Sequence, residues 1–413
     1  MKEVSKSWAE VDQRHAWHPF TDQEEWEKSE PLVICRGKGS WLFDAEDRAF
    51  LDANSSIWTN IHGHSHPVIV EAIQKQAATL SHSSFLGFTN DRASELAEKL
   101  CALFPCGQLS RCFFSDDGST ALEVAFKMSL QWRQQRGETE KTRIIAFENA
   151  YHGDTLGAAS VGGVSRFLKG YGEAGLVVTR VSGLEQLASL SDELVASTSA
   201  VVIEPLIQGV NQMNPWPAGM LAGLRQWTEE RGIHLILDEV MTGFGRTGKM
   251  FACQHEEVVP DFLCLAKGLT GGTMPLAATL TTSGIYEGFK GPGNTFYYGH
   301  SYTGNPLGCA AALASLSLFE KEQTLGGVER KGAFLEEGLK KIPGVRDVRR
   351  LGLILGFDIE GDGPEFCLEL RKESVLTRPI LNTIVLMPPL SVTDRELVHL
   401  VEAVGKTAKT VLR

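Results

Sequence analysis

Three features of this 413-residue chain predict an α/β fold. Short apolar runs alternate with longer helical patterns through residues 61–310, which is typical of a largely parallel sheet covered by helices on both faces. Polar residues and glycines follow several of these runs directly. Residues 311–413 instead mix helices with short strands, which indicates a smaller α+β domain. We therefore expect one large domain and one small domain.

Residues 1–60 are expected to form an extended N-terminal arm and a hairpin that belong to the small domain. The hairpin pairs residues 39–44 with residues 49–52 across a polar turn. The arm carries four aromatic side chains that we expect to anchor it: Trp8, Trp17, Phe20 and Trp26.

Helices and strands of the large domain follow from the spacing of its apolar residues. The helical patterns span Val68–Ser81, Arg92–Phe104, Ser119–Arg136 and Pro217–Arg231. The strand-like runs are Arg111–Ser115, Arg143–Phe147, Ala200–Glu204, Ile233–Asp238, Asp261–Ala266 and Pro275–Thr281. Beyond them we expect helices at Pro306–Glu322 and Glu329–Lys341 and short strands near Val348 and Leu353.

The composition excludes several classes of protein. Hydrophobic residues make up 43% and charged residues 22%, and no apolar run approaches the ~18 residues of a membrane span. The net charge of −11 argues against nucleic-acid binding, which needs clustered Lys and Arg. The eight cysteines include no C-x-x-C pair, so we expect no metal site and a reducing, cytoplasmic compartment.

Five polar segments follow apolar runs directly. In a parallel sheet, ligands bind at the carboxyl ends of the strands, so these segments should converge on one cleft. They are Ser115–Ser119, Asn149–Asp154, Glu204–Pro205, Asp238–Glu239 and Lys267.

Lys267 and Asp238 are the candidates for chemistry with an aldehyde cofactor. Lys267 follows an apolar strand, where desolvation lowers the pKa of the amine, and a neutral amine forms a Schiff base with pyridoxal 5'-phosphate (PLP). The alternative is a strand-end lysine that reaches solvent. Asp238 would hold the pyridine nitrogen of PLP protonated, and the alternative is a carboxylate that stabilises a loop.

The remaining parts of a PLP site are also present. Gly118 and Ser119 open a helix, and backbone N–H groups at a helix N-terminus bind a phosphate, although Ser119 equally fits an N-cap. The aromatic face of Tyr151 would lie against a planar ring, although a loop tyrosine often only packs. Together with Lys267 and Asp238, these residues supply a Schiff-base lysine, a ring acid, a phosphate cradle and a stacking ring.

A nucleotide-binding loop is the rival interpretation of one segment. The run Gly243–Lys249 nearly completes a Walker A motif after an acidic strand. Met250 then stands where Ser or Thr would bind magnesium, and no strand of its own precedes the loop. We therefore reject the NTPase interpretation.

Two blocks, Ile236–Gly248 and Lys267–Gly272, resemble the signature of class III aminotransferases. These are PLP enzymes of fold type I that act on ω-amino groups, and the resemblance runs from Trp17 to about Pro389. It implies a mostly parallel seven-stranded sheet and the cofactor pyridoxal 5'-phosphate.

Within the class, the chain is most similar to the biotin-synthesis branch, which transaminates 8-amino-7-oxononanoate to 7,8-diaminononanoate. The segments that carry this likeness are Trp17–Phe20, Ser55–Trp58, Ile61–His64, Asn149–Asp154, Gly271–Met274, Gly304–Pro306, Thr377–Pro379 and Leu386–Pro389.

The resemblance implies roles for individual residues. Lys267, Asp238 and Tyr151 correspond to the catalytic residues, and Gly118 with Ser119 to the phosphate cradle. The segment Gly299, His300 and Ser301 would come from the neighbouring subunit, which implies a homodimer with shared active sites, and the hydroxyl of Ser301 would bind the phosphate. Arg378 would hold the carboxylate of the keto substrate between apolar walls that Phe20, Ile57 and Trp58 supply.

Three departures from the family pattern leave the amino donor open between S-adenosylmethionine and lysine. Phe20 replaces a common Tyr, Ile57 replaces a common Trp, and Ser301 replaces a common Thr. The first two remove a hydroxyl and an aromatic surface that a bulky sulfonium donor would use. The segment His300–Asn305 resembles members thought to use lysine.

Two other functions stay open. One is a different class III ω-aminotransferase that takes a diamine, 4-aminobutyrate or a β-amino acid with pyruvate or 2-oxoglutarate. A 2-oxoglutarate enzyme needs a further arginine for the second carboxylate; the sequence offers no obvious candidate, and Arg246 is left open for this role. The other is a catalytically silent PLP-binding scaffold, which the presence of both Lys267 and Asp238 disfavours.

Overall fold

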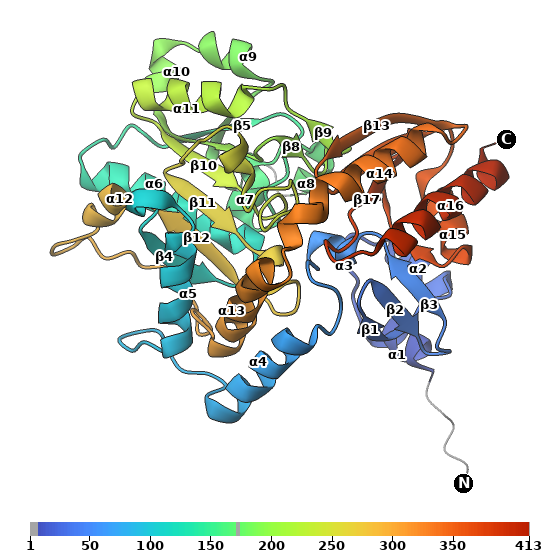
Figure 1. The fold of residues 1–413 in the computed structure, drawn as a ribbon. Helices are drawn as coiled ribbons and strands as arrows, with labels where there is room; N and C mark the ends of the chain where they lie inside the picture. The colour runs from blue at the N-terminus through green and yellow to red at the C-terminus, as the bar shows by residue number, and fades with distance from the viewer. Residues whose placement is uncertain (1–6, 171–173, 413) are drawn as a thin grey trace.

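A seven-stranded sheet forms the centre of the protein in its computed structural model, which describes residues 7–170 and 174–412 (Figure 1). Its strand order is β4-β12-β11-β10-β7-β5-β6. Neighbouring strands run parallel from β11 to β6, and only β12 is antiparallel to both its neighbours. The strands are β4 (Arg111–Ser115), β5 (Arg143–Phe147), β6 (Val177–Val181), β7 (Thr198–Ile203), β10 (His234–Asp238), β11 (Phe262–Leu265) and β12 (Ala277–Thr281). The expected mostly parallel sheet is confirmed.

Helices cover both faces of this sheet, as its sequence of continuous apolar strands predicts. Successive residues of β10 point to opposite faces, so Leu235 and Leu237 belong to one apolar cluster and Ile236 to another. Helix α6 lies on the face of Ile236. The helices around the sheet are α4 (Pro67–Thr79), α5 (Asp91–Ala102), α6 (Gly118–Gln135), α7 (Leu156–Val161), α8 (Ser165–Leu168), α9 (Leu184–Ala188), α10 (Asp192–Ala196), α11 (Met220–Glu230), α12 (Ser283–Glu287) and α13 (Pro306–Lys321). Short 3-10 turns lie at Pro105–Gly107, Ala252–His255, Lys267–Thr270 and Thr324–Gly327.

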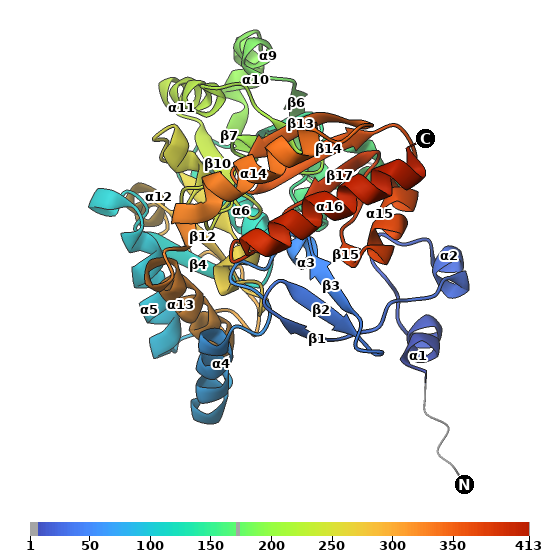
Figure 2. The same ribbon diagram turned by 45° about the vertical axis from the view of Figure 1, so that its right-hand side comes forward.

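The two ends of the chain meet in a second group of elements (Figure 2). The hairpin β2–β3 forms as expected, and β15 from the C-terminal part adds to it parallel to β3. A separate sheet, β13-β14-β17-β16, packs with the last helices. The elements are β1 (Ile34–Lys38), β2 (Trp41–Asp44), β3 (Ala49–Asp52), α3 (Ser55–Trp58), α14 (Val328–Lys340), β13 (Val345–Leu351), β14 (Ile354–Ile359), α15 (Gly363–Lys372), β15 (Val375–Leu376), β16 (Pro379–Ile380), β17 (Thr383–Leu386) and α16 (Asp394–Val411), with the small pair β8 (Ile207–Gln208) and β9 (Asn214–Pro215) beside the cleft. The division at residues 60 and 310 stays a prediction.

The N-terminal arm is not extended, contrary to expectation; its first six residues lie outside the described ones. The arm folds into two short helices, α1 (Trp8–His15) and α2 (Gln23–Lys28), which begin after Ser7 and Asp22. Both cap side chains accept backbone N–H groups of the first turn, which stabilises helices too short to show a clear periodicity.

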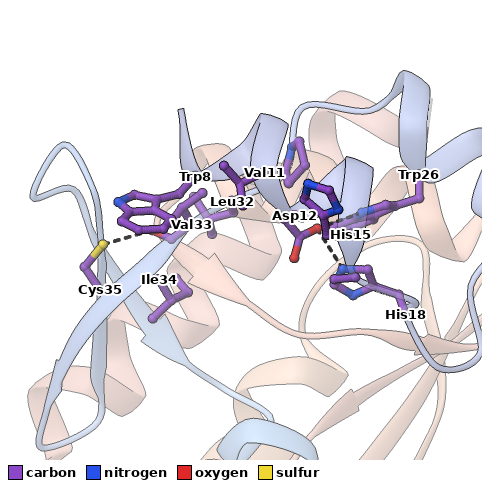
Figure 3. Close-up of a pocket in the computed structure, with 12 residues that line it drawn as sticks. Trp8, Val11, Asp12, His15, His18, Trp26, Leu32, Val33, Ile34 and Cys35 are labelled. Atoms are coloured by element: carbon purple, nitrogen blue, oxygen red, sulfur yellow. Dashed lines mark hydrogen bonds and ion pairs between the residues drawn. The ribbon is translucent and has the colours of Figure 1, made fainter. Parts of the chain in front are cut away.

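The aromatic residues of the arm do not all anchor it. Trp26 packs on His18 and donates its indole N–H to Asp12 at 3.0 Å, whereas Trp17 is 88% exposed. Trp8 and Trp26 also line an open groove of about 660 Å³ on the surface (Figure 3). In the described part of the chain, no helix is both long enough and apolar enough to cross a lipid bilayer.

Candidate active site

The predicted strand exits converge on one cavity of about 770 Å³ at the carboxyl edge of the central sheet. Residues at the ends of β4, β5, β7 and β10 and in the turn after β11 line its inner part. The residues from these positions that line it are Asp117, Gly118, Ser119, Tyr151, His152, Gly153, Glu204, Asp238 and Lys267.

Lys267, the predicted Schiff-base lysine, lines this cavity. It begins the 3-10 turn after β11, in a left-handed conformation with φ of 43°. Burial lowers the pKa of Lys267 to about 8, although the charges of Asp238 and Glu204 act in the opposite direction. Its Nζ lies 4.8 Å from the ring centroid of Trp58, which forms part of the same wall. A share of the amine is therefore neutral near pH 7, as the sequence predicted.

Asp238 is buried and held in a fixed orientation. Its Oδ2 lies 2.8 Å from Nδ1 of His152, and its Oδ1 accepts the N–H of Val240 at 3.1 Å. His152 had no predicted role of its own, although the histidine stands beside Tyr151 at a strand exit. The Nε2 atom of His152 is buried and has no partner among the described residues. The imidazole therefore serves to orient the carboxylate.

Glu204, from one of the predicted strand exits, is a second buried carboxylate of the cavity. It accepts the N–H of Gly209 at 3.0 Å and the N–H of Tyr151 at 3.2 Å. Burial raises the pKa of Glu204 to about 7, with the charge of His152 acting in the opposite direction. Glu204 thus fixes the loop that carries Tyr151 and contributes to the electrostatic environment of Lys267.

The N-terminus of α6 opens into the cavity and fits a phosphate group. The N-cap of this helix is Asp117, so the following N–H groups of Gly118 and Ser119 face the cavity side. The hydroxyl of Ser119 accepts the N–H of Asp154 at 3.1 Å and donates to no described group. A Cβ on Gly153, where φ is 122°, would lie 2.1 Å from Ser119 Oγ. Glycine at this position therefore keeps the cradle open.

Apolar and aromatic side chains form the outer part of the cavity. Tyr151 donates its hydroxyl to Asp154 at 2.5 Å, and its ring contacts Phe167 edge to face. Phe167 in turn contacts Phe20, with the ring centroids 5.7 Å apart. The other predicted substrate contacts, Ile57, Trp58 and Arg378, line the same space.

Arg246 is not available to bind a substrate carboxylate. It is fully buried, and it donates to the carbonyl of Asn60 at 2.6 Å and to the carbonyl of Pro388 at 2.7 Å. Burial lowers the pKa of Arg246 to about 9. The possibility that Arg246 binds a second substrate carboxylate was therefore wrong. Its guanidinium connects its own segment to the segments of Asn60 and Pro388.

The segment Gly299–Ser301 does not line the cavity of its own chain. His300 lies 3.5 Å from Asp116, and the ring of Tyr302 contacts His82. This position is compatible with a role at the site of a second subunit, which stays a prediction here.

Comparison with known proteins defines the class. The family described as aminotransferase class III matches residues 23–407. The chain belongs to this family. It therefore has the fold of a fold type I aminotransferase and uses pyridoxal 5'-phosphate as its cofactor.

The chain is also similar to individual proteins of this family. The adenosylmethionine-8-amino-7-oxononanoate aminotransferase of Geobacter sulfurreducens is 43% identical, over 97% of this chain and 97% of that protein. The crystal structure of the enzyme of that name from Methanocaldococcus jannaschii superposes with a TM-score of 0.94 at 38% identity, covering 98% of each chain. An amine transaminase from an uncultivated Pseudomonas species, solved with bound PLP, has a TM-score of 0.88 at 32% identity and covers 95% of this chain and 98% of that one.

Proposed function

We propose that the protein transfers an amino group to 8-amino-7-oxononanoate and forms 7,8-diaminononanoate for biotin synthesis. The single observation that supports this substrate is the position of Arg378 in the cavity. Its guanidinium lines the same cavity as Lys267 and forms no ion pair within the described part of the chain. A free cation at one side of an apolar cavity is suited to a long aliphatic keto acid with a terminal carboxylate. The names of the relatives in Geobacter and Methanocaldococcus support the same substrate.

The chain's residues divide the chemistry among them. Lys267 would hold PLP, which would supply an electron sink for the reacting carbon of the substrate. Asp238, oriented by His152, would be the carboxylate partner that keeps the ring nitrogen protonated. The N-terminus of α6 and the Ser119 hydroxyl would hold the phosphate of PLP. The amine of Lys267 would move a proton at the reacting carbon, and its lowered pKa suits it to this role.

The proposed donor is S-adenosylmethionine, as the names of the relatives state. Lysine is the second candidate, because Phe20 and Ile57 replace side chains that a bulky sulfonium donor would contact. Both positions line the cavity, and Phe20 is 60% exposed. Rapid mixing of the cofactor-loaded protein with each compound separates them: the true donor removes the visible absorbance of the bound cofactor.

We propose that the active form is a homodimer in the cytoplasm. Large apolar side chains are exposed on two neighbouring segments, residues 82–90 and 297–304, which Asn90 joins by donating to the carbonyl of Gly304 at 3.0 Å. They are Leu86, Phe88, Tyr297 and Tyr302. An exposed apolar patch of this kind marks a protein interface. The same segment carries Gly299–Ser301, so the interface would bring it to the partner's cavity. The eight free cysteines support a reducing compartment.

The test of the substrate is product analysis. The loaded protein is incubated with each donor and 8-amino-7-oxononanoate, and 7,8-diaminononanoate is measured by mass spectrometry. Parallel reactions replace the keto acid with pyruvate or 2-oxoglutarate and the donor with a diamine, 4-aminobutyrate or a β-amino acid. Product from the first reaction supports the proposal. Turnover only in the parallel set would assign another ω-aminotransferase, and no turnover with any pair would assign a silent scaffold.

A further inference from the structure

A left-handed helical turn forms part of the cavity wall. Ser55, Ser56, Ile57 and Trp58, the residues of α3, have φ values of 47°, 48°, 66° and 66°. Ser56 and Ile57 also have ψ values of 55° and 56°, close to the ideal left-handed helix. L-residues rarely adopt this conformation in succession, and a β-branched residue such as Ile57 is disfavoured there most.

This turn presents its side chains to the reacting centre. Ile57 and Trp58 both line the cavity, and the Trp58 ring lies against Nζ of Lys267. The hand of a turn decides where its side chains point, so a right-handed turn would place a different wall here. Strained backbone of this kind persists only where the surrounding structure fixes it, and it gathers at ligand sites. The question is which residues fix it.

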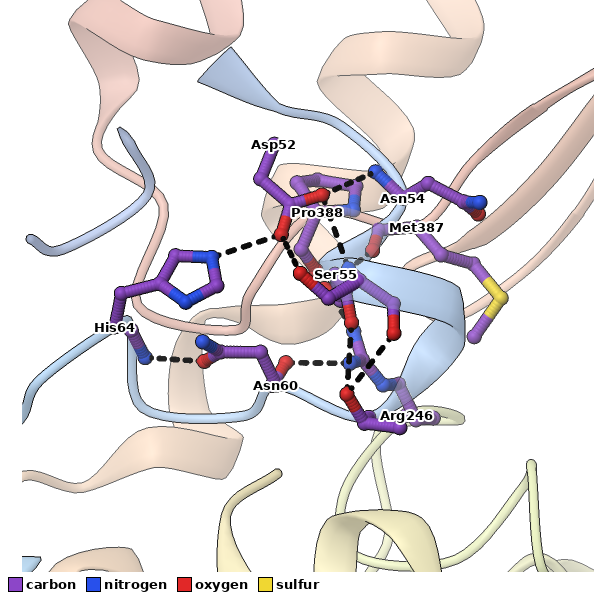
Figure 4. Close-up of polar contacts among 11 residues, drawn as sticks. Asp52, Asn54, Ser55, Asn60, His64, Arg246, Met387 and Pro388 are labelled. Atoms are coloured by element: carbon purple, nitrogen blue, oxygen red, sulfur yellow. Dashed lines mark hydrogen bonds and ion pairs between the residues drawn. The ribbon is translucent and has the colours of Figure 1, made fainter. Parts of the chain in front are cut away.

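Asp52 supplies the densest set of contacts to the turn (Figure 4). Its Oδ1 accepts the N–H of Ser56 at 3.0 Å and that of Asn54 at 3.3 Å. Its Oδ2 accepts the hydroxyl of Ser56 at 2.8 Å and lies 2.8 Å from Nε2 of His64. Asp52 is only 2% exposed. Burial acts to raise the pKa of Asp52, but these hydrogen bonds hold the pKa below its usual value. One buried carboxylate therefore holds the start of the turn on two sides.

His64 holds Asp52 from the other side and is itself fixed by the hairpin. The backbone of His64 exchanges two hydrogen bonds with Gly39, at 2.7 and 3.1 Å. A Cβ on Gly37 would lie 2.7 Å from the Cβ of His64, so the imidazole sits directly on strand β1. The Asp52–His64 pair thus connects the turn to the hairpin rather than to solvent.

The rest of the turn is tied to the segments that carry the other substrate contacts. Ser55 donates its hydroxyl to the carbonyl of Met387 at 2.6 Å, and the indole N–H of Trp58 donates to Asn54 at 2.8 Å. Asp52 lies opposite Leu376 in the parallel pair of β3 and β15, two residues before Arg378. The end of β3 therefore lies next to both the turn that carries Ile57 and Trp58 and the start of the segment that carries Arg378.

We propose that Asp52 and His64 are positioning residues that hold the Ser55–Trp58 turn in its left-handed form and thereby select the aliphatic chain of the substrate. The proposal rests on the function proposed above for the identity of that chain. Neither residue lines the cavity, so their effect on the substrate passes through Ile57 and Trp58.

The test compares Asp52→Ala with Asp44→Ala. Asp44 is a matched control: it is 4% exposed, accepts N–H groups of Glu46 and Arg48 within the hairpin, and does not line the cavity. For Asp52→Ala we expect the KM for 8-amino-7-oxononanoate to rise about tenfold, and the preference over shorter keto acids to fall by a similar factor. The value of kcat should change far less. Asp52→Asn, which keeps one acceptor for the N–H of Ser56, should recover part of the loss.

A fluorescence measurement on the cofactor-free protein reports the turn independently of activity. The difference in emission between each protein and its Trp58→Phe counterpart isolates Trp58. Acrylamide should quench this signal more strongly in Asp52→Ala than in Asp44→Ala or the parent. Equal KM, equal selectivity and equal quenching in the two variants would overturn the proposal.

Two further outcomes are also decisive. If Asp52→Ala does not fold, Ser56→Ala removes only the hydroxyl bond to Asp52 and must move KM and quenching in the same direction; no change there refutes the proposal. If the parent does not accept 8-amino-7-oxononanoate, the proposed function fails, while the quenching comparison still decides whether Asp52 holds the turn.

Discussion

The lowered pKa of Lys267 makes the pH dependence of cofactor capture a quantitative prediction. With a pKa of about 8, the amine is neutral above that pH and largely protonated below it. At pH 7, about 9% of the amine is neutral, against about 0.03% for an amine of pKa ~10.5, a difference of about 300-fold. The rate at which the cofactor-free protein captures PLP should therefore rise with pH to a midpoint near 8 and then level off.

The variant Glu204→Gln tests how a neighbouring charge contributes to the pKa of Lys267. The charge of Glu204 acts to raise the pKa of Lys267, so its removal should move the midpoint to lower pH. The rate at pH 7 should increase, by at most about tenfold, because the neutral fraction cannot exceed one. The assay is stopped-flow absorbance after mixing cofactor-free protein with PLP between pH 6 and about 9.5, a window that spans the midpoint. The reaction of PLP with Nα-acetyllysine, whose ε-amine is free, corrects for titration of the cofactor itself.

Glu123→Gln is the matched control, since Glu123 binds Thr155 and the N–H of Ala158 outside the cavity. It should leave the midpoint unchanged. A midpoint near 10 in the parent protein, or equal midpoints in the parent and Glu204→Gln, would refute this account of the amine.

Three other changes test separate parts of the site. Arg378→Ala should raise the KM for 8-amino-7-oxononanoate about 10- to 100-fold, as expected for loss of a hydrogen-bonded charge, and leave the half-reaction with the donor nearly unchanged; equal effects on both would show that Arg378 does not recognise the keto acid. Gly153→Ala should weaken PLP binding at least about tenfold by fluorescence titration, because the added methyl group meets Ser119, and unaltered affinity would remove α6 from the phosphate site. Leu86→Asp combined with Phe88→Asp should give monomers by sedimentation equilibrium and abolish turnover, whereas an active monomer would contradict the shared site.

Much of the site was predictable because its residues stand at the ends of apolar strands. Lys267 and Asp238 each follow a continuous run that is buried at every position, and the parallel order of β10 and β11 brings their ends to one edge. The helix after Gly118 follows from its long apolar periodicity. In each case, local pattern and global topology agree, which is when a sequence reports its structure most directly.

Other features depend on contacts between distant segments, which spacing along the chain does not reveal. Arg246 lies in a recognisable motif, yet its partners Asn60 and Pro388 come from opposite ends of the sequence. The left-handed turn at Ser55–Trp58 contains no glycine that would predict it, and Ser56 within it donates two hydrogen bonds to Asp52. The long helix α16 was missed although its capping box, Thr393 with Glu396, is a local signal that was available.

Identification of the lysine that carries the cofactor is the most direct test of the proposed site at Lys267. The PLP-loaded protein is reduced with borohydride, digested and analysed by tandem mass spectrometry, which locates the pyridoxyl group. We expect the group on the peptide that contains Lys267, and no modification of that peptide in the Lys267→Ala variant, which should also lack visible cofactor absorbance and turnover. A pyridoxyl group on a different lysine, or visible absorbance and turnover that survive in Lys267→Ala, would contradict the account.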